Sequence, residues 1–187
     1  MTSDLSIFLR QVLRNPSQIS AVAPSSERLA RKMVAALPDS AGPIVELGPG
    51  TGKFTRALLA AGVAPHDLAA FEMSQDFVSH LRQRFPLVDV RHRGAQYMDE
   101  AFGTTPLRAV VSGLPLLSIP LQIQRAILSA AFRRLAPGAP FIQFTYGPFP
   151  PVPQALRDEL GLSARSTGWV MANLPPAQVY LFTRNPH

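Results

Sequence analysis

A glycine-rich string in the first third of the chain is the feature best suited to binding a small molecule. The β-rich run at residues 44–47 leads directly into Gly48-Pro49-Gly50-Thr51-Gly52, and a helical pattern follows. Glycines at this position let the backbone approach a ligand closely at the carboxyl edge of a parallel sheet. The string is not a nicotinamide fingerprint, because its third glycine comes one residue early. It also lacks the Gly-Lys-Ser/Thr ending of a Walker loop.

Two glutamates accompany the glycines. Glu72 ends the next β-rich run about 20 residues later, at the spacing from which an acid binds a ribose diol. Glu46 stands just before the glycines, where a carboxylate would repel a pyrophosphate but attract a ligand that carries an ammonium and a sulfonium. The alternative is that the glycines form only a tight turn and that Glu72 caps the following helix.

These residues need a sheet that brings several strand ends together, and the hydrophobic pattern predicts one. From residue 44 onward, β-rich runs alternate with helical patterns, which requires a parallel sheet with right-handed crossovers. The last two β-rich runs have no helix between them and predict a hairpin-like pair at one edge. The expected strands span residues 44–47, 68–72, 88–91, 107–112, 141–146, 163–171 and 178–184. The expected helices between them span residues 53–61, 74–85 and 122–135.

The string from Glu46 to Gly52, taken with Glu72, resembles the cofactor motifs of the class I S-adenosylmethionine-dependent methyltransferases. The resemblance covers residues 44–184. It implies an α/β, Rossmann-like sheet of seven mostly parallel strands, the last antiparallel, with helices on both faces. It also implies that S-adenosylmethionine is the cofactor.

The same resemblance assigns residues to the cofactor. Glu72 would bind both ribose hydroxyls, and Met73 would line the adenine. After the third strand such enzymes usually carry Gly-Asp-Ala, whereas this chain has Gly94-Ala95-Gln96, so that Gln96 is the substitute hydrogen-bonding group. The cofactor site implied in this way comprises Ser25, Glu46, Gly48, Gly50, Thr51, Gly52, Glu72, Met73, Ala95, Gln96, Ser112 and Leu114.

The segment after the fourth expected strand is where these enzymes place the methyl acceptor. Enzymes that methylate base amines carry Asn or Asp followed by Pro-Pro-Tyr or Leu-Pro-Tyr there. Residues 112–117 of this chain read Ser-Gly-Leu-Pro-Leu-Leu. This string keeps the leucine-proline bend of the backbone, but it has neither the polar side chain that accepts from the base amine nor the aromatic ring that stacks on the base. The chain provides instead an apolar mouth opposite residues 141–148. Its residues are Leu114, Leu116, Leu117 and Ile119.

This mouth, together with the strings at residues 15–16, 23–26 and 173–177, resembles the bacterial phospholipid N-methyltransferases of the Rhodobacter type. The resemblance implies stepwise methylation of phosphatidylethanolamine toward phosphatidylcholine, in an apolar pocket that favours the neutral amine. Tyr146 is the candidate catalytic residue nearest that amine, unless it is only packed in the core. Three alternatives stay open. They are an ornithine-lipid N-methyltransferase, an rRNA adenine dimethyltransferase, which the basic charge would suit, and a non-catalytic sensor of S-adenosylmethionine and lipid.

Two helices are expected before the sheet, so that residues 1–37 form an N-terminal helical extension and residues 38–187 the methyltransferase domain. The first is a short basic amphipathic helix that lies in a membrane interface or, alternatively, packs permanently over the cofactor site. The second spans residues 26–37, with Ser25 or Ser26 as its N-cap. The residues expected to contact substrate or membrane are Phe8, Leu9, Arg10, Val12, Arg14, Leu116 and Leu117.

The composition excludes several classes of site. The chain has no cysteine, which excludes a disulfide scaffold, a thiolate metal site and a cysteine nucleophile. No spacing of histidines and acids suggests a metal. Its 18 basic and 12 acidic residues give a net charge of +6, which indicates a phosphate-bearing partner. The apolar mouth favours an anionic membrane surface over nucleic acid. With neither a spanning segment nor a secretory signal, we expect a cytoplasmic protein, peripherally bound to the cytoplasmic face of the inner membrane.

Overall fold

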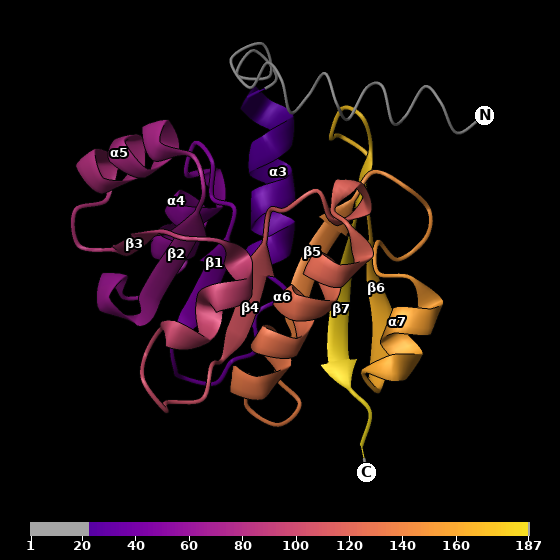
Figure 1. Cartoon of the computed structure of the whole chain (residues 1–187). Coiled ribbons are helices and arrows are strands. Elements are labelled where there is room, and N and C mark those ends of the chain that lie inside the picture. Colours follow the sequence, from indigo (N-terminus) through magenta and orange to yellow (C-terminus); the bar gives the residue numbers. More distant parts are fainter. Residues whose placement is uncertain (1–22, 187) are drawn as a thin grey trace.

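The computed structural model describes residues 23–186, and the side chains from residue 27 onward. These residues form a seven-stranded sheet with the order β3-β2-β1-β4-β5-β7-β6 (Figure 1). Strands β1 to β5 are parallel to one another, and β7 runs antiparallel between β5 and β6. The strands are β1 (Ile44–Leu47), β2 (Leu68–Glu72), β3 (Asp89–His92), β4 (Ala109–Ser112), β5 (Phe141–Thr145), β6 (Leu162–Val170) and β7 (Ala177–Arg184). The expected Rossmann-like sheet, including the hairpin-like pair at one edge, is confirmed.

Every expected strand begins and ends within two residues of an observed one. The largest difference is at β4, which was expected to begin at Leu107. The backbone nitrogen of Leu107 instead donates to the carbonyl of Arg134 (2.7 Å), and its carbonyl accepts from Ala136 (2.9 Å). Leu107 therefore joins the end of the preceding loop to the end of a helix rather than extending the strand.

Helices cover both faces of the sheet (Figure 1). One face carries α3 (Ala23–Val34), α4 (Lys53–Ala60) and α5 (Gln75–Arg84), and the other carries η3 (Ala95–Glu100), α6 (Leu121–Arg134) and α7 (Gln154–Glu159). Side chains alternate between the faces along each strand. In β1, Ile44 packs in the same cluster as Met33 of α3, whereas Val45 packs in the cluster that holds Leu128 of α6. The remaining short 3₁₀ helices are η2 (Pro65–Asp67) and η4 (Leu116–Ser118).

The helix before the sheet differs from its expected bounds. Ser25 and Ser26 were expected at the N-cap, but they lie inside α3, which includes Ala23 and Pro24. Proline is tolerated in the first turn of a helix, because the first backbone N–H groups have no helical partner there. The helix can therefore begin before the serines. The helix α7, which follows a proline-rich loop, was not expected.

The expected amphipathic helix with Phe8, Leu9, Arg10, Val12 and Arg14 lies outside the described residues. Within residues 23–186, no helix has the length and apolar character needed to cross a bilayer.

The carboxyl ends of β1, β2, β4 and β5 meet at one edge of the sheet, which is uppermost in Figure 1. The loop between β6 and β7 lies at the same edge, because β7 is antiparallel to β5. The start of α3 also lies there. This edge therefore gathers the loops in which the candidate site residues stand.

Candidate active site

The glycine loop between β1 and α4 is held to Glu72 at the end of β2. Oε2 of Glu72 accepts a hydrogen bond from the backbone nitrogen of Gly50 (3.1 Å). Oε1 accepts from the backbone nitrogens of Met73 and Ser74, both at 2.8 Å. The same carboxylate thus fixes the turn into α5 and stands beside the glycine loop, so that capping and ligand binding are compatible roles.

At two positions of this edge, the geometry of the backbone explains why the residue is glycine. Gly50 has a φ of 54°, in the left-handed region, and no atom lies within 4 Å of the position that a Cβ would take there. None of the described residues therefore fills the space beside Gly50. Gly113, just after β4, stands so close to Gly48 that a Cβ would lie 2.7 Å from the carbonyl oxygen of Gly48. The glycine loop and the loop after β4 are consequently in direct contact.

Glu46 is a fully buried carboxylate behind the glycine loop. Its Oε2 accepts a hydrogen bond from the hydroxyl of Thr55 in α4 (2.7 Å). Its Oε1 has no hydrogen-bond partner among the described residues. Burial raises the pKa of Glu46 to about 7, and the hydrogen bonds from Thr55 oppose that rise. A buried carboxylate with one free oxygen is a ready acceptor for a cationic ligand group.

Two buried glutamines fix the loop that follows β4. The amide nitrogen of Gln143 in β5 donates to the carbonyl of Leu114 (2.9 Å). That of Gln124 in α6 donates to the carbonyls of Leu116 and Ile119, both at 2.9 Å. The sequence pattern did not single out either glutamine, because nothing in a strand or helix sequence marks a side chain that will meet a distant loop.

The expected residues of this loop divide between core and surface. Ser112 is fully buried, and its hydroxyl accepts from the backbone nitrogen of Leu114 (3.3 Å). Leu114 is partly buried and lies against Gly48. Leu116 is 1% exposed and packs in the core, whereas Leu117 is 55% exposed. Of the last two leucines, only Leu117 offers a surface to an acceptor.

An aromatic wall stands beside the loop. The rings of Phe54 and Phe144 meet edge to face with centroids 5.8 Å apart, and those of Phe144 and Tyr146 do so at 5.4 Å. Burial raises the pKa of Tyr146, against a smaller opposing effect of its hydrogen bond to the side chain of Asn173. The hydroxyl therefore stays protonated near neutral pH. Phe54 was not singled out from the sequence, although it stands two residues after Gly52.

The residues expected around the adenine, Met73, Ala95 and Gln96, do not form a closed pocket among the described residues. Met73 is 73% exposed. Ala95 is buried, and the side chain of Gln96 folds back over Gly94, where a Cβ would lie 2.6 Å from its Oε1. The polar end of Gln96 is thus held near its own loop.

The remaining three expected cofactor residues belong to elements that begin at the same edge. Thr51 is exposed at the turn into α4. Gly52 is the N-cap of α4, and its backbone nitrogen donates to the carbonyl of Pro49 (2.9 Å). Ser25 belongs to the first turn of α3, and its side chain lies outside the described part of the chain.

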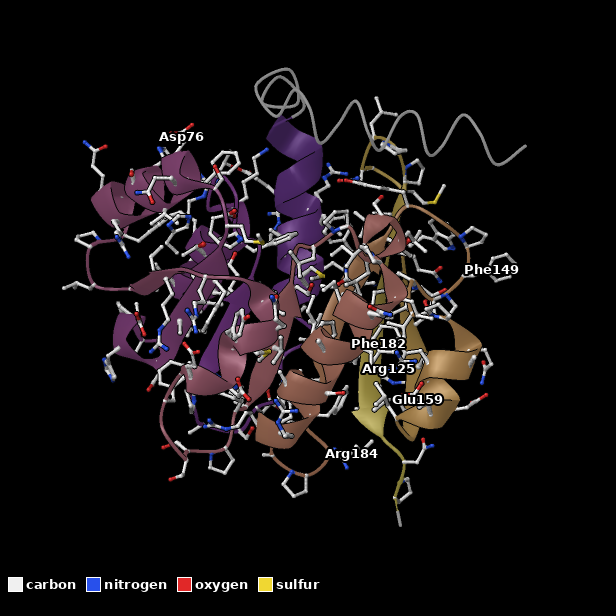
Figure 2. The ribbon with its side chains drawn as sticks, in the orientation of Figure 1. Asp76, Arg125, Phe149, Glu159, Phe182 and Arg184 are labelled. Atoms are coloured by element: carbon white, nitrogen blue, oxygen red, sulfur yellow. The ribbon has the colours of Figure 1, made fainter. Side chains whose placement is uncertain are left out.

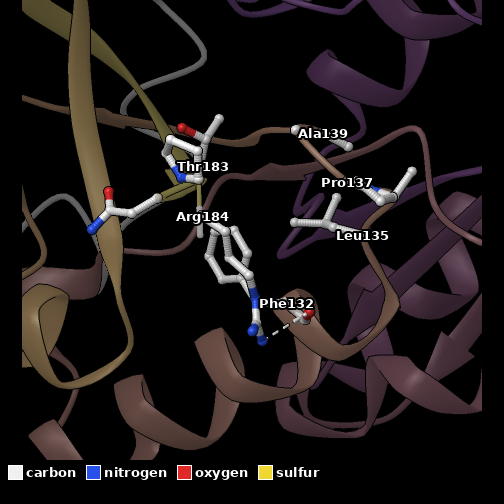
Figure 3. A pocket seen from close by; sticks show the side chains of 10 residues that line it. Phe132, Leu135, Pro137, Ala139, Thr183 and Arg184 are labelled. Atoms are coloured by element: carbon white, nitrogen blue, oxygen red, sulfur yellow. Dashed lines mark hydrogen bonds between the residues drawn. The ribbon is translucent and has the colours of Figure 1, made fainter.

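A cavity of about 630 Å³ lies at the opposite edge of the sheet, between the end of α6, the turn before β5 and the end of β7 (Figure 3). Arg184 lines it and donates to the carbonyl of Phe132 (3.3 Å). This cavity is separate from the glycine loop, since β5 begins and β7 ends at that edge. Among residues 23–186, no group of three or more His, Cys, Asp or Glu could hold a metal ion.

A family model described as a methyltransferase domain matches residues 44–138, from the first residue of β1 to the turn after α6. The ornithine lipid N-methyltransferase of Singulisphaera acidiphila is 33% identical over 154 residues, which cover 78% of this chain and 80% of that protein. The chain belongs to the class I S-adenosylmethionine-dependent methyltransferases.

Solved structures of other methyltransferases share the fold. A TehB-like S-adenosylmethionine-dependent methyltransferase from Corynebacterium glutamicum superimposes with a TM-score of 0.69 and 13% identity, covering 94% of this chain and 97% of that one. The glycopeptide N-methyltransferase MtfA, in complex with S-adenosylmethionine, superimposes with a TM-score of 0.66 and 14% identity, covering 85% of this chain and 94% of that one. At these identities the likeness establishes the fold of this methyltransferase and not its acceptor.

The cofactor of this methyltransferase is S-adenosylmethionine. The residues at the carboxyl edge fit that molecule. Within the described part of the chain, the buried oxygen of Glu46 that has no partner suits an ammonium group, the carboxylate of Glu72 suits a pair of hydroxyls, and no atom fills the space beside Gly50. S-adenosylmethionine supplies a methyl group made electrophilic by its attachment to a sulfonium.

Proposed function

We propose that this methyltransferase transfers methyl groups to the primary amine of a membrane lipid, with ornithine lipid as the first acceptor to test. The observation that carries the proposal is the 33% identity, over four-fifths of its length, to a protein named as an ornithine lipid N-methyltransferase. Phosphatidylethanolamine, which the resemblance to the phospholipid N-methyltransferases implies, presents the same primary amine on a two-tailed lipid and is the second acceptor. The apolar mouth at Leu114 and Leu117 supports a lipid over a planar base.

In this proposal two carboxylates orient the cofactor. Glu46 pairs with its ammonium group, since the unpartnered oxygen of Glu46 is buried and a cation would satisfy it. Glu72 binds the ribose hydroxyls while its hydrogen bonds to Gly50 and Met73 hold the carboxylate in place. A carboxylate fixed by backbone donors needs no rearrangement when the ligand arrives.

The acceptor amine must be neutral before its lone pair can attack. An apolar surrounding disfavours the charged ammonium and therefore lowers the pKa of the amine. The new N–C bond forms as the S–C bond breaks, and the additional proton of the methylated ammonium leaves to solvent. Tyr146 positions the amine through its hydroxyl or ring. It does not act as a base, because burial keeps its phenol protonated.

The test is transfer of a labelled methyl group from S-adenosylmethionine to three acceptors offered separately: ornithine lipid, phosphatidylethanolamine and bulk ribosomal RNA. We expect label in lipid, and its loss in a Glu72→Ala variant. The matched control is Glu159→Ala, which removes an exposed carboxylate of α7 on the opposite face of the sheet. Label in RNA alone would overturn the proposal in favour of a base methyltransferase. Binding of S-adenosylmethionine and lipid without transfer to any acceptor would overturn it in favour of a sensor.

A further inference from the structure

Two neighbouring loops at the carboxyl edge carry large apolar side chains that the fold leaves in solvent. The loop after β5 exposes Phe149 (77%), which points away from the body of the protein in Figure 2. The end of β6 and the loop that joins it to β7 expose Trp169 (41%), Met171 (72%) and Leu174 (76%). We call these four residues the apolar rim. Isolated exposed apolar residues are ordinary on a protein surface, but a group of them on adjacent loops indicates a binding surface.

The two loops form one fixed surface. Their strands are paired, with Thr145 of β5 in register with Gln178 of β7, so that both loops leave the sheet side by side. The hydroxyl of Tyr180 in β7 donates to the carbonyl of Pro148 in the first loop (2.9 Å). Asn173 of the second loop lies near enough to Tyr146, the first residue of the first loop, to affect the pKa of its hydroxyl.

The second loop is also tied to itself. The side-chain amide of Asn173 donates to the carbonyl of Pro175 (2.7 Å), and its backbone nitrogen donates to the carbonyl of Val170 (3.0 Å). These bonds hold the loop backbone while Met171 and Leu174 remain exposed. The loop backbone that carries the rim is therefore already ordered, so that less conformational entropy is lost when the rim binds a partner.

The part of the chain that carries the rim has few acids and several basic residues. Neither loop, residues 146–153 or 171–176, contains a charged residue. Between residues 101 and 187 the only acids are Asp158 and Glu159, against seven arginines. Arg125 pairs with Glu159 through two contacts of 2.7 and 2.8 Å, and both residues lie below Phe149 in the view of Figure 2. Nζ of Lys32 lies 3.7 Å from the position of a Cβ on Gly168, beside the last residues of β6.

We propose that the apolar rim inserts into the interface of an anionic lipid bilayer and so brings the mouth of the active site to the membrane surface. This inference rests on the proposed function and adds to it the surface through which the enzyme reaches its lipid. Aromatic and aliphatic side chains without charges enter the headgroup region, and basic residues around them are attracted to anionic lipids. The pairing of β5 with β7 and the bond from Tyr180 to Pro148 place the inserted loops next to Tyr146, the proposed acceptor position. A second copy of the chain is a poorer partner for this surface, since each copy carries a charge of +6.

The test compares three forms of the full-length protein: wild type, the double variant Phe149→Ser/Met171→Ser, and the control Leu87→Ser. Leu87 is 76% exposed, as much as the rim residues, but it lies between α5 and β3 at the opposite edge of the sheet. Three quantities are measured for each, in addition to self-association by analytical ultracentrifugation. They are partition onto vesicles of phosphatidylglycerol and phosphatidylcholine, methyl transfer to substrate lipid dispersed in detergent micelles, and the Tm without lipid.

For the double variant we expect at least tenfold weaker partition, since each side chain removes apolar area worth about a factor of ten when buried. Its micellar activity and its Tm should match those of the wild type, and the control should match in all three. Unchanged partition of the double variant would overturn the proposal, and a Tm loss with unchanged partition would show that the chain itself covers the rim. Loss of concentration-dependent self-association in the double variant, with partition unchanged, would assign the rim to a second copy. Absence of methyl transfer from wild-type protein to micellar lipid would refute the proposed function separately, because that assay needs no membrane contact.

Discussion

The affinity for S-adenosylmethionine should fall as the pH drops below 7, because Glu46 must be ionised to attract an ammonium group. Burial raises the pKa of Glu46 to about 7 in the ligand-free enzyme, so that the carboxyl is half protonated near neutral pH. Its Oε1 has no hydrogen-bond partner among the described residues. Binding of a cation there therefore releases a proton whenever the site begins in the protonated form.

The size of the change in Kd follows from the titration of Glu46 alone. With a pKa of about 7, roughly nine-tenths of the sites are ionised at about pH 8 and roughly one-tenth at about pH 6. We therefore expect the Kd for S-adenosylmethionine to be about tenfold higher at about pH 6 than at about pH 8, a difference of about 1.4 kcal/mol. A Thr55→Val variant removes the hydrogen bond that favours the ionised form and should move this dependence to higher pH.

The assay is isothermal titration calorimetry of wild type and Glu46→Gln across this pH range. The ligand has its own titrating amine, so the informative quantity is the ratio of the two Kd values at each pH, in which the contribution of the ligand cancels. The Kd of Glu46→Gln divided by the Kd of the wild type should be smallest at low pH, where Glu46 is protonated and resembles glutamine. This ratio should grow by about tenfold as the pH rises. A ratio independent of pH would refute the assignment of Glu46 to the ammonium group.

The same group makes a linked prediction about the stability of the ligand-free enzyme. Because the folded pKa lies above the ordinary value of 4.5, the folded protein holds a proton that the unfolded chain releases between pH 4.5 and about 7. The free energy of unfolding should therefore fall with rising pH through that window, by about 3 kcal/mol in all for this group. Glu46→Gln should remove this part of the pH dependence, as urea unfolding at several pH values would reveal.

Three further predictions concern the geometry of the site and the surface around it. Gly113→Ala should lower the free energy of unfolding by about 1–3 kcal/mol and weaken cofactor binding, since its Cβ would meet the carbonyl of Gly48; an unchanged Tm would contradict the close approach of the two loops. Tyr146→Phe should lower kcat/KM about two- to tenfold, as expected for one lost hydrogen bond, and leave the pH profile unchanged, because the phenol is protonated throughout; a shifted profile would indicate a base. Arg125→Ala should change the free energy of unfolding by less than about 1 kcal/mol, because its pair with Glu159 is nearly half exposed, and denaturant titration would detect any larger effect.

The order of the elements could be predicted because each strand is a short buried run with its own turn signal. Strands β1 and β2 match their expected bounds fully, since glycines follow the first and a polar N-cap, Ser74, follows the second. The start of α3 was placed too late, because serines are strong N-cap signals, whereas a proline in the first turn is compatible with an earlier start. Helix α7 was missed because six residues after a proline-rich loop give too short a pattern to register as helical.

In the candidate site, the residues that could be predicted are those whose roles follow from nearby sequence, and the residues that were missed act through distant contacts. The proposed cofactor half depends on residues that are near one another in the sequence or at a fixed spacing, such as Glu46, Gly50 and Glu72, and these lie together at the carboxyl edge. Gln143 and Asn173 could not be assigned a partner in the same way. The hydrogen bond of Gln143 reaches 29 residues to Leu114, and Asn173 lies near Tyr146, 27 residues away in the sequence. No local pattern encodes a contact of that range.

This division explains why the acceptor is harder to identify than the cofactor. In the proposed site, the acceptor side is built from the loop after β4 and the aromatic wall beside it, and the side chain that this loop exposes, Leu117, is apolar and belongs to no recognisable motif. Such side chains exclude water and favour a neutral amine without reading the rest of the headgroup. Discrimination between ornithine lipid and phosphatidylethanolamine must therefore depend on how the headgroup anion, a carboxylate or a phosphate, meets polar groups at the mouth. A comparison of kcat/KM for the two lipids in the same micelles isolates that difference, since the amine, the cofactor and the apolar contacts are common to both.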